Sequence, residues 1–386
     1  MSGTNSLSIL ERLVAFPSVS AESNLPIIDH ISGFLAERGF TLHRVTDPGG
    51  NKAGLIARLG PADGAGIMLS GHTDVVPTAG QSWTSDPFQL RHGGDRVFGR
   101  GTADMKGFLA AMLSLADRAR SARLQEPLTL VFSWDEELGC LGIPHMLPDL
   151  TELLPVPRLC IVGEPTEMQI ALGHKGKIAL GASCSGMAGH SAMAPDFVNA
   201  IHLATDLVAG IRQLQEKIAR DGARDEAYDI PYATLHVGKI AGGRALNIVP
   251  DLATLDFECR YPACQELEPI LADIRALAAS VAATYQRKSA DIRVDLGTLF
   301  AYPGLGVAPD RPEVRLLQQF VPSAAHIKVA YGTEAGYFDQ IGIPTLVCGP
   351  GSMEQGHKPD EFITLSELAR CDAMCDRILA YLSVAA

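Results

Sequence analysis

Two histidines and three carboxylates of this chain have the chemistry of metal ligands: His72, Asp104, Glu137, Glu164 and His357. Imidazole and carboxylate groups are the hard or borderline ligands that suit Zn²⁺, Co²⁺ or Mn²⁺. Five ligands can hold two ions when one carboxylate bridges them, and a separation of roughly 3.5–4 Å then lets both ions share a hydroxide. Asp104, in the glycine-rich segment 99–107, is the expected bridge. Any one of these residues alone could cap a turn, but the set of five indicates a dinuclear metal site.

Further acidic residues lie beside these ligands in the sequence. Asp74 follows His72 by two residues, close enough to accept a hydrogen bond from the ring nitrogen that faces away from the metal, although it could instead form a turn before Pro77. In the doublet Glu136-Glu137 the two side chains must diverge. One of them can therefore bind metal while its neighbour acts as a general base on the bridging water. The alternative for the doublet is a solvated acidic loop.

The elements that must position these residues alternate between helical and strand-like patterns. Apolar residues at helical spacing run from Leu25 to Leu35 and predict a helix that ends at Gly39. Four short β-rich runs, at 67–70, 128–132, 159–162 and 345–348, each lead into a loop that contains expected ligands. Open α/β sheets place their sites at the carboxyl ends of strands, so we expect the four loops to converge on one crevice.

The pattern changes in the middle of the chain. Strands at 178–184, 234–240 and 252–260 and helices at 198–218 and 267–282 predict a compact α+β sandwich. We therefore expect two domains: a catalytic domain formed by residues 1–176 and 292–386, which ends in a helix at 365–382, and an inserted domain formed by residues 177–291. A length of 386 residues agrees with two or three domains.

Composition and charge exclude several classes of protein. With 47% hydrophobic and 20% charged residues the chain has the composition of a folded protein. The net charge of -12 argues against a nucleic-acid or anionic-membrane partner, which would need a basic surface. There is no apolar run of membrane-spanning length and the first residues lack a signal-peptide pattern, so we expect a cytoplasmic location. The eight dispersed cysteines predict buried or partly buried free thiols.

Six ordered motifs carry a family resemblance over nearly the whole chain: SGHTDVVP, GRGTADMKG, DEELGCLG, GEPT, GMAGHSA and GPGSMEQGHKPDEFI. They resemble the dinuclear-zinc amidohydrolases, a family that comprises acetylornithine deacetylase, succinyl-diaminopimelate desuccinylase, aminoacylase and the glutamate-releasing carboxypeptidase. The segments HKGKI, IPYATLHVGKIAGG and GTEAGYF are most similar to the acetylornithine deacetylase branch. The resemblance implies an α/β catalytic domain with a mixed sheet, like that of the zinc exopeptidases, and an inserted α+β lid through which two chains form a homodimer.

The resemblance also implies a role for each residue of the metal site. His72, Asp104 and Glu164 would hold one metal ion, Asp104, Glu137 and His357 would hold the other, and Glu136 would be the general base. The ions would be Zn²⁺ first, with Co²⁺ or Mn²⁺ as alternatives. His190 would reach the active site of a partner subunit and stabilise the tetrahedral oxyanion. From its own surroundings, His190 is only a polar residue in a glycine-rich turn.

Candidate substrate contacts come from four further segments. Asn247 and Arg260 match positions that bind substrate in the family, and the planar guanidinium of Arg260 would clasp an α-carboxylate. A salt bridge is the alternative for Arg260. Lys175, Thr333 and Glu334 could line the pocket or could serve turns and packing. Glu334 is the nearest acidic residue not assigned to metal, so it is the candidate partner for a side-chain ammonium.

These implications converge on the hydrolysis of an N-acyl amino acid by a metal-dependent amidohydrolase. The first candidate substrate is N²-acetyl-L-ornithine, which would give L-ornithine and acetate in arginine biosynthesis. A succinyl-diaminopimelate desuccinylase or a broader aminoacylase is the alternative within the family. A catalytically silent binding relative is disfavoured because the metal residues and Glu136 are intact. A serine nucleophile is disfavoured because the sequence has no GxSxG elbow.

Overall fold

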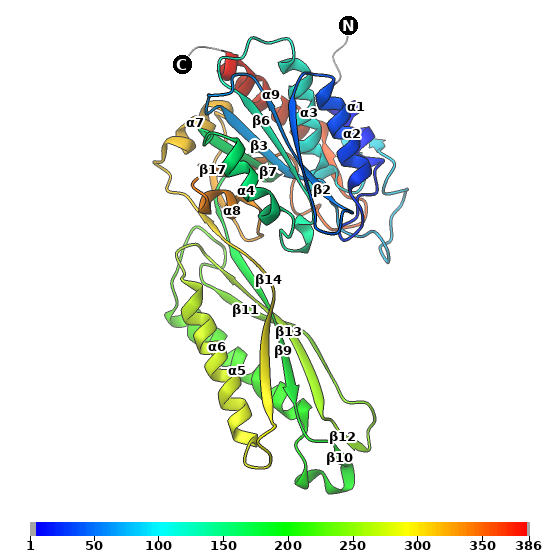
Figure 1. The fold of residues 1–386 in the computed structure, drawn as a ribbon, viewed down its shortest axis with the longest axis vertical. Helices are drawn as coiled ribbons and strands as arrows, with labels where there is room; N and C mark the ends of the chain where they lie inside the picture. The colour runs from blue at the N-terminus through cyan, green and yellow to red at the C-terminus, as the bar shows by residue number, and fades with distance from the viewer. Residues whose placement is uncertain (1–4, 384–386) are drawn as a thin grey trace. The chain divides into compact units, whose positions relative to one another are not determined.

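The computed structural model describes residues 5–383, which form two compact units. Unit 1 comprises Met1–Gly173, Val307–Lys328 and Thr333–Ala386, and unit 2 comprises His174–Gly306 and Val329–Gly332. In Figure 1 the labelled elements from β9 to β14 along the chain, coloured green to yellow, belong to unit 2, and the other labelled elements belong to unit 1. Residues 1–4 and 384–386, the two ends of the predicted catalytic domain, lie outside the described residues.

A mixed sheet forms the centre of unit 1, with the strand order β1-β2-β6-β3-β7-β17-β8 and with β16 beside β8. Its strands are β1 (Thr41–Thr46), β2 (Ala53–Leu59), β3 (Ile67–His72), β6 (Leu128–Ser133), β7 (Leu159–Pro165), β8 (Ile170–His174), β16 (His326–Val329) and β17 (Thr345–Gly349). The four predicted β-rich runs are β3, β6, β7 and β17. These four are consecutive in the sheet and run parallel, so their carboxyl ends meet at one edge.

Helices lie on both sides of this sheet (Figure 1). They are α1 (Ser6–Val14), α2 (Leu25–Ala36), α3 (Gly107–Ala119), α4 (Ile143–Leu153), α7 (Pro312–Phe320), α8 (Ala335–Gln340) and α9 (Leu365–Ser383). The predicted helix at 25–35 is α2, which begins with Pro26 in its first turn and buries Ile27, Ile28, Ile31 and Leu35. Helix α3 packs against both α1 and α9 and is almost wholly buried. A small sheet of β4 (Arg91–Gly93), β5 (Arg96–Phe98) and β18 (Phe362–Thr364) completes the unit.

Unit 2 is an antiparallel sheet with the order β11-β13-β9-β14, covered by two helices. The strands are β9 (Gly176–Ser185), β11 (Thr234–Gly242), β13 (Leu252–Tyr261) and β14 (Arg293–Tyr302), and the helices are α5 (Ala200–Asp221) and α6 (Leu267–Tyr285). Leu203 and Leu207 of α5, Ile274 of α6, and Leu255 and Phe257 of β13 are buried in one core. A separate pair of short strands, β10 (Gly189–His190) and β12 (Ile248–Val249), carries His190. The predicted sandwich is therefore present.

The boundary after the insertion differs from the predicted one. The sequence pattern predicts a return to the catalytic domain at residue 292, but β14 pairs with β9 from Arg293 to Tyr302 and belongs to unit 2. After the short strand β15 (Leu305–Gly306), the chain returns to unit 1 at Val307. The alternating pattern of β14 suits either sheet, and only its pairing partner decides where it belongs.

The eight cysteines are all free thiols, as their dispersed spacing predicts. Seven of them are buried, whereas Cys264 is exposed, which corrects the expectation that every thiol would be at least partly buried. Among the helices of residues 5–383, none is both long enough and apolar enough to cross a membrane.

Candidate metal centre

Four adjacent strand ends of unit 1 deliver the predicted metal ligands. His72 is the last residue of β3, and Glu164 lies one residue before the end of β7. The doublet Glu136-Glu137 opens a single helical turn (Glu136–Leu138) just after β6, and His357 lies in the loop that follows β17. Asp104 comes from a distorted turn, Thr102–Lys106, that leads into α3. The predicted convergence of strand-end loops is thus what the fold produces.

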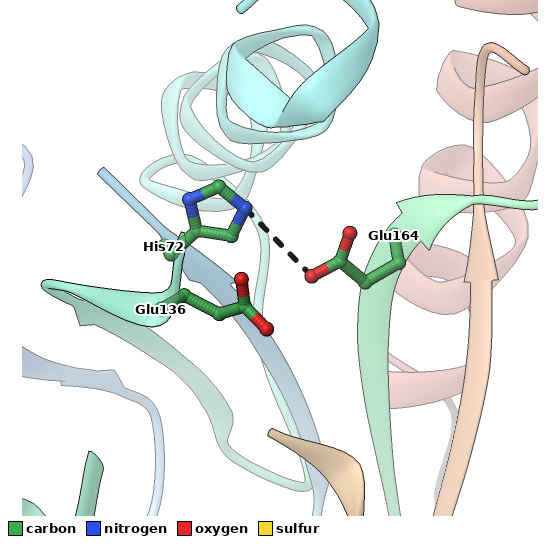
Figure 2. Close-up of side chains that lie close together, drawn as sticks. All are labelled: His72, Glu136 and Glu164. Carbon is green, nitrogen blue, oxygen red and sulfur yellow. Dashed lines mark ion pairs between the residues drawn. The ribbon is translucent and has the colours of Figure 1, made fainter. Parts of the chain in front are cut away.

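His72 lies at the centre of the cluster and is buried. Its Nε2 atom is 3.2 Å from Oδ1 of Asp104 and 3.7 Å from Oε1 of Glu164. One oxygen of Glu136 also lies within 4.8 Å of ligand atoms of His72 and Glu164, and Figure 2 shows these three side chains facing one another. Burial alone would lower the pKa of His72, but its contacts with Asp104, Asp74 and Glu164 raise the pKa well above its ordinary value.

Asp104 lies between the two histidines, as expected for a bridging ligand. Its Oδ1 atom faces His72, and its Oδ2 atom is 3.2 Å from Nε2 of His357. Nε2 of His357 is also 2.9 Å from Oε2 of Glu137. Burial works to raise the pKa of Asp104, but hydrogen bonds to His357 and His72 hold it far below the ordinary value. Hydrogen bonds to Asp104 and Glu137 raise the pKa of His357 to about 10.

The charges of this cluster fit divalent cations. Burial raises the pKa of Glu164 well above its ordinary value, and repulsion from Asp104 and Glu136 adds to the shift. Burial and the charge of Asp104 likewise raise the pKa of Glu137 to about 7. Buried carboxylates that repel one another are stabilised by a shared cation, and both imidazole Nε2 atoms point at carboxylate oxygens. Two groups of three side chains lie close enough to share an ion: His72 with Glu136 and Glu164, and His72 with Asp104 and Glu137. The donor set therefore has the composition that divalent ions favour.

Asp74 has a wider role than the sequence predicted. The Nδ1 atom of His72 lies 2.9 Å from the backbone oxygen of Asp74 and 3.5 Å from its Oδ1 atom, so the ring faces the backbone as well as the carboxylate. The carboxylate also accepts hydrogen bonds from the backbone N–H groups of Glu136 (3.2 Å) and Glu137 (3.4 Å) and from the Ser20 hydroxyl (2.7 Å). One carboxylate thus fixes both His72 and the glutamate doublet.

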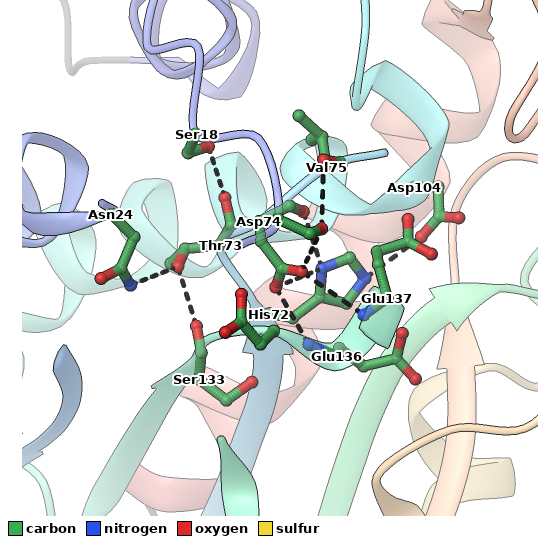
Figure 3. A network of polar contacts seen from close by, with 12 residues as sticks. Ser18, Asn24, His72, Thr73, Asp74, Val75, Asp104, Ser133, Glu136 and Glu137 are labelled. Atoms are coloured by element: carbon green, nitrogen blue, oxygen red, sulfur yellow. Dashed lines mark hydrogen bonds and ion pairs between the residues drawn. The ribbon is translucent and has the colours of Figure 1, made fainter. Parts of the chain in front are cut away.

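A layer of uncharged hydrogen bonds ties the same strand ends together, as Figure 3 shows. The Thr73 hydroxyl donates to the Ser133 carbonyl at 2.8 Å and accepts from the Asn24 side chain at 3.0 Å. The Ser18 hydroxyl donates to the Thr73 carbonyl at 2.6 Å. These contacts join the end of β3 to the end of β6 and to the segment that precedes α2. They hold His72 and the glutamate doublet at a fixed separation.

Glu334 and Thr333 lie at the start of α8 and are both buried. The Thr333 hydroxyl accepts the Ala335 N–H at 3.0 Å, which is the turn role that the sequence analysis left open. Burial raises the pKa of Glu334 to about 7, while the Ser133 hydroxyl and the charge of His72 work in the opposite direction. The charge of Glu334 also contributes to the raised pKa of Glu136. Glu334 is therefore close to the metal-ligand cluster.

His190 and Asn247 are exposed residues of unit 2 and lie close to one another. His190 pairs with Ile248 across β10 and β12, and its Nδ1 atom accepts the Ala192 N–H at 3.1 Å. The carbonyl oxygen of Asn247 accepts the Ser191 N–H at 3.1 Å. The metal-ligand cluster lies in unit 1, so the joint action of these two residues with that cluster stays a prediction.

Arg260 and Lys175, also in unit 2, make internal contacts. The Nε atom of Arg260 donates to Glu258 at 2.8 Å, and Nη1 lies 3.4 Å from the Tyr302 hydroxyl, which is the salt-bridge alternative considered for this residue. The Lys175 ammonium donates to the carbonyl oxygens of Ile230 (2.7 Å) and Tyr232 (2.9 Å) and so braces that loop. The substrate roles of both residues stay predictions.

Several residues that support the cluster are not among those predicted from the sequence. The Cys140 thiol donates to Oε1 of Glu136 at 3.3 Å, and its spacing of four residues within DEELGC was the available signal. Lys52 forms a buried ion pair with Asp135, the residue before Glu136. Glu361, four residues after His357, accepts hydrogen bonds from the loop that carries Asp104. The contacts of Lys52 and Glu361 join residues distant in sequence, so no local pattern predicts them.

Comparisons with known proteins agree with this geometry. A model of the peptidase family M20/M25/M40 matches residues 68–381. Acetylornithine deacetylases from Erwinia tasmaniensis and Shigella sonnei are each 33% identical over 367 residues, which is 93% and 92%, respectively, of this chain and of each relative.

Solved structures share the fold. An M20 family metallo-carboxypeptidase from Sulfolobus solfataricus superposes with a TM-score of 0.79 at 16% identity, over 99% of this chain and 100% of that chain. A dinuclear metal binding peptidase of the M20 family from Bacillus subtilis superposes with a TM-score of 0.66 at 14% identity, over 98% of both chains. The family match and the curated relatives each span most of the sequence. The chain therefore belongs to the peptidase family M20/M25/M40 and is a metal-dependent hydrolase of that family.

Proposed function

We propose that this protein hydrolyses the amide bond of an N-acyl amino acid at two divalent metal ions, with N²-acetyl-L-ornithine as the substrate. The observation that carries the proposal is the placement of Asp104 between His72 and His357, each 3.2 Å away, with Glu136 beside the same cluster. The 33% identity to acetylornithine deacetylases supports the choice of substrate.

The metal ligands divide into two sets that share Asp104. His72, Asp104 and Glu164 would hold one ion, and Asp104, Glu137 and His357 would hold the other, in agreement with the contacts among these side chains. When bound, the two ions lower the pKa of a water and polarise the acyl carbonyl. Zn²⁺ fits the mixed imidazole and carboxylate set best, and Co²⁺ or Mn²⁺ would be accepted by the same ligands.

The proton transfers are assigned to Glu136. Asp74 holds the Glu136 backbone N–H, and the Cys140 thiol donates to one oxygen of the Glu136 carboxylate. The backbone and the carboxylate are therefore each held by one contact. Burial raises its pKa well above the ordinary value, and the charge of Glu137 adds to the shift, which suits a group that must accept a proton from water. Glu136 would then return that proton to the leaving amine. A covalent acyl-enzyme is not needed.

Five further residues are assigned to substrate recognition. Arg260 would bind the α-carboxylate after exchanging part of its contact with Glu258, and Glu334 would face the side-chain ammonium of ornithine. Asn247 and Lys175 complete the proposed substrate contacts, and Thr333 fixes the turn before Glu334. A cationic substrate also agrees with the net charge of -12.

A homodimer formed through unit 2 is part of the proposal. Large apolar side chains are exposed on this unit: Met193, Ile230, Ile240, Leu246, Ile248, Leu252 and Leu299. Contiguous exposed apolar surface favours a protein partner. Ile248 pairs with His190 across β10 and β12, and Met193 and Leu246 lie within three residues of these strands in the sequence. A partner chain could therefore bring His190 to its own metal centre to stabilise the oxyanion. A cytoplasmic location agrees with the eight free cysteines.

The proposal is tested by activity assays on chelator-treated protein. We expect the metal-free enzyme to be inactive, two equivalents of Zn²⁺ or Co²⁺ to restore it, and N²-acetyl-L-ornithine to give a higher kcat/KM than N-succinyl-diaminopimelate or N-acetylmethionine. The double variant His72→Ala, His357→Ala is the control and should stay inactive at any metal concentration. Full activity without metal, or in this variant, would overturn the metal mechanism. A preference for another substrate would overturn the substrate assignment alone.

A further inference from the structure

The carboxylate of Glu361 is surrounded by hydrogen-bond donors on the loop that carries Asp104. Glu361 is only 1% exposed. Its Oε1 atom accepts the backbone N–H groups of Ala103 (2.8 Å) and Asp104 (3.0 Å), and its Oε2 atom accepts the Gly101 N–H (2.8 Å) and Nη1 of Arg100 (2.8 Å). Four donors from one loop therefore bind one buried side chain, and all are charge-assisted contacts of the strong kind.

This loop depends on such an anchor because its backbone departs from regular helix geometry. Gly101 has a left-handed conformation with φ of 82°, and Asp104 has φ of -120° and ψ of 91° within the turn Thr102–Lys106. Buried N–H groups in such a segment need partners outside the helix, and leaving them unpaired is destabilising. Glu361 supplies the partner for the Asp104 N–H itself, so it fixes the backbone from which the Asp104 carboxylate projects.

The ion pair between Arg100 and Glu361 is also connected to the backbone of His357. Nη2 of Arg100 donates to Oε1 of Gln81, and Nε2 of Gln81 donates to the His357 carbonyl oxygen at 2.9 Å. Nη1 of Arg100 lies 3.3 Å from the carbonyl oxygen of Lys358. A continuous chain of polar contacts thus runs from the loop of Asp104 to the loop of His357, whose side chains face each other at 3.2 Å.

We propose that Glu361 is a positioning residue that, through Arg100 and Gln81, holds Asp104 and His357 at the separation that metal binding requires. The inference rests on the proposed function, because that proposal assigns Asp104 and His357 to metal. It goes beyond it by assigning the affinity for metal partly to a residue that touches neither ion nor substrate. Residues that orient metal ligands typically change metal affinity or activity by about 10–100-fold when replaced.

The test compares Glu361→Gln with a matched control. Glutamine keeps the shape but presents an NH₂ group where two donors need an acceptor. Glu126→Gln is the control, since Glu126 also accepts one backbone N–H (Gly66, 3.1 Å) and one guanidinium (Arg158, 2.8 Å) but lies away from the ligands. Calorimetric titration of metal-free protein with Zn²⁺ should show a Kd about 10–100-fold weaker for Glu361→Gln and unchanged for Glu126→Gln.

Hydrogen exchange supplies a readout that needs no metal. The amides of Gly101, Ala103 and Asp104 should exchange faster in metal-free Glu361→Gln than in the parent protein, and at the parent rate in Glu126→Gln. Equal Zn²⁺ affinity in the parent and in Glu361→Gln, or an equal loss in the control, would overturn the inference. A parent protein that fails to bind two equivalents of Zn²⁺ would instead overturn the proposed function.

A milder variant decides the question if Glu361→Gln does not fold. Gln81→Ala keeps Glu361 and its contacts with the loop backbone, and removes the side chain that links Arg100 and the Trp83 indole N–H to the His357 carbonyl. Gln81 is partly exposed, so this variant should fold. A loss of Zn²⁺ affinity smaller than that stated above for Glu361→Gln is expected. Parent-like affinity in Gln81→Ala would then overturn the inference.

Discussion

At the scale of single residues, the structure separates two adjacent glutamates. Glu137 contacts His357 at 2.9 Å, whereas Glu136 joins His72 and Glu164 and accepts the Cys140 thiol. Both backbones are held by Asp74, so the doublet has little freedom to exchange the two side chains. The assignment of one residue to metal and the other to proton transfer follows from these different surroundings.

We expect Glu136→Gln to keep both metal ions and to lower kcat by at least about 10²-fold, because a general base is lost while the ligands remain. Glu137→Gln should instead lose metal, since its carboxylate faces His357. Metal content by mass spectrometry and kcat, measured on both variants, check the assignment. Equal metal loss in the two variants would contradict the division of roles.

Glu334 supplies a prediction about the substrate. If its carboxylate faces the ornithine ammonium, Glu334→Gln should raise KM for N²-acetyl-L-ornithine much more than for N-acetylmethionine, because only the first substrate loses a charge-assisted hydrogen bond. Glu313→Gln is the control, since Glu313 is also buried but lies on α7 and is paired with Arg311, the residue before that helix. An equal effect of Glu334→Gln on both substrates would show that Glu334 acts on the metal cluster, and the broader aminoacylase alternative would then lead.

At the scale of elements, the close packing of α3 on β7 positions Glu164. A Cβ atom placed on Gly163 would lie 2.0 Å from the ring of Phe108, so the strand can approach the helix only because residue 163 is glycine. Phe108 is fully buried near the start of α3, shortly after Asp104. The contact between Gly163 and Phe108 therefore connects the strand that carries Glu164 with the helix that follows Asp104.

We expect Gly163→Ala to lower the free energy of unfolding by about 1–3 kcal/mol through overpacking, and to weaken Zn²⁺ binding because Glu164 moves with the strand. Gly33→Ala is the matched control: Gly33 lies on the exposed face of α2 with nothing within 4 Å of the added carbon. That variant should raise the free energy of unfolding by about 0.5–1 kcal/mol. Chemical denaturation of both variants measures the difference, and parent-like stability of Gly163→Ala would contradict the packing argument.

At the scale of the whole molecule, the metal ligands lie in unit 1 and His190 lies in unit 2. The exposure of His190 and of the apolar residues near it fits a surface that meets a second copy of the chain. Catalysis in a homodimer would then require one chain to complete the site of the other. The activity of a dimer formed from two different variant chains would therefore depend on which residue each chain has lost.

A mixed dimer of one Glu136→Ala chain and one His190→Ala chain should recover about half of the parent activity, because one of its two sites would contain both intact residues. Each variant alone should be nearly inactive. Differently tagged chains purified through both tags supply the sample, and sedimentation checks its mass. A mixed dimer as inactive as its parents, or a fully active monomer, would contradict action across the interface.

The sequence by itself determined the elements and the kinds of ligand. The helix at 25–35 and the β-rich runs that became β3, β6, β7 and β17 were visible because periodicity and residue type are properties of consecutive residues. The convergence of His72, Glu137, Glu164 and His357 also followed, because parallel strands end at the same edge of a sheet.

Only the tertiary structure decided which distant residues meet. The pairing of β14 with β9 moved residues 293–302 into unit 2, and Asp74 proved to hold the glutamate doublet as well as His72. Glu361 binds the Asp104 loop across more than 250 residues of sequence, as the separation of 257 from Asp104 shows. Such contacts depend on strand register and loop geometry, which are fixed when the chain packs and leave no local pattern in the sequence.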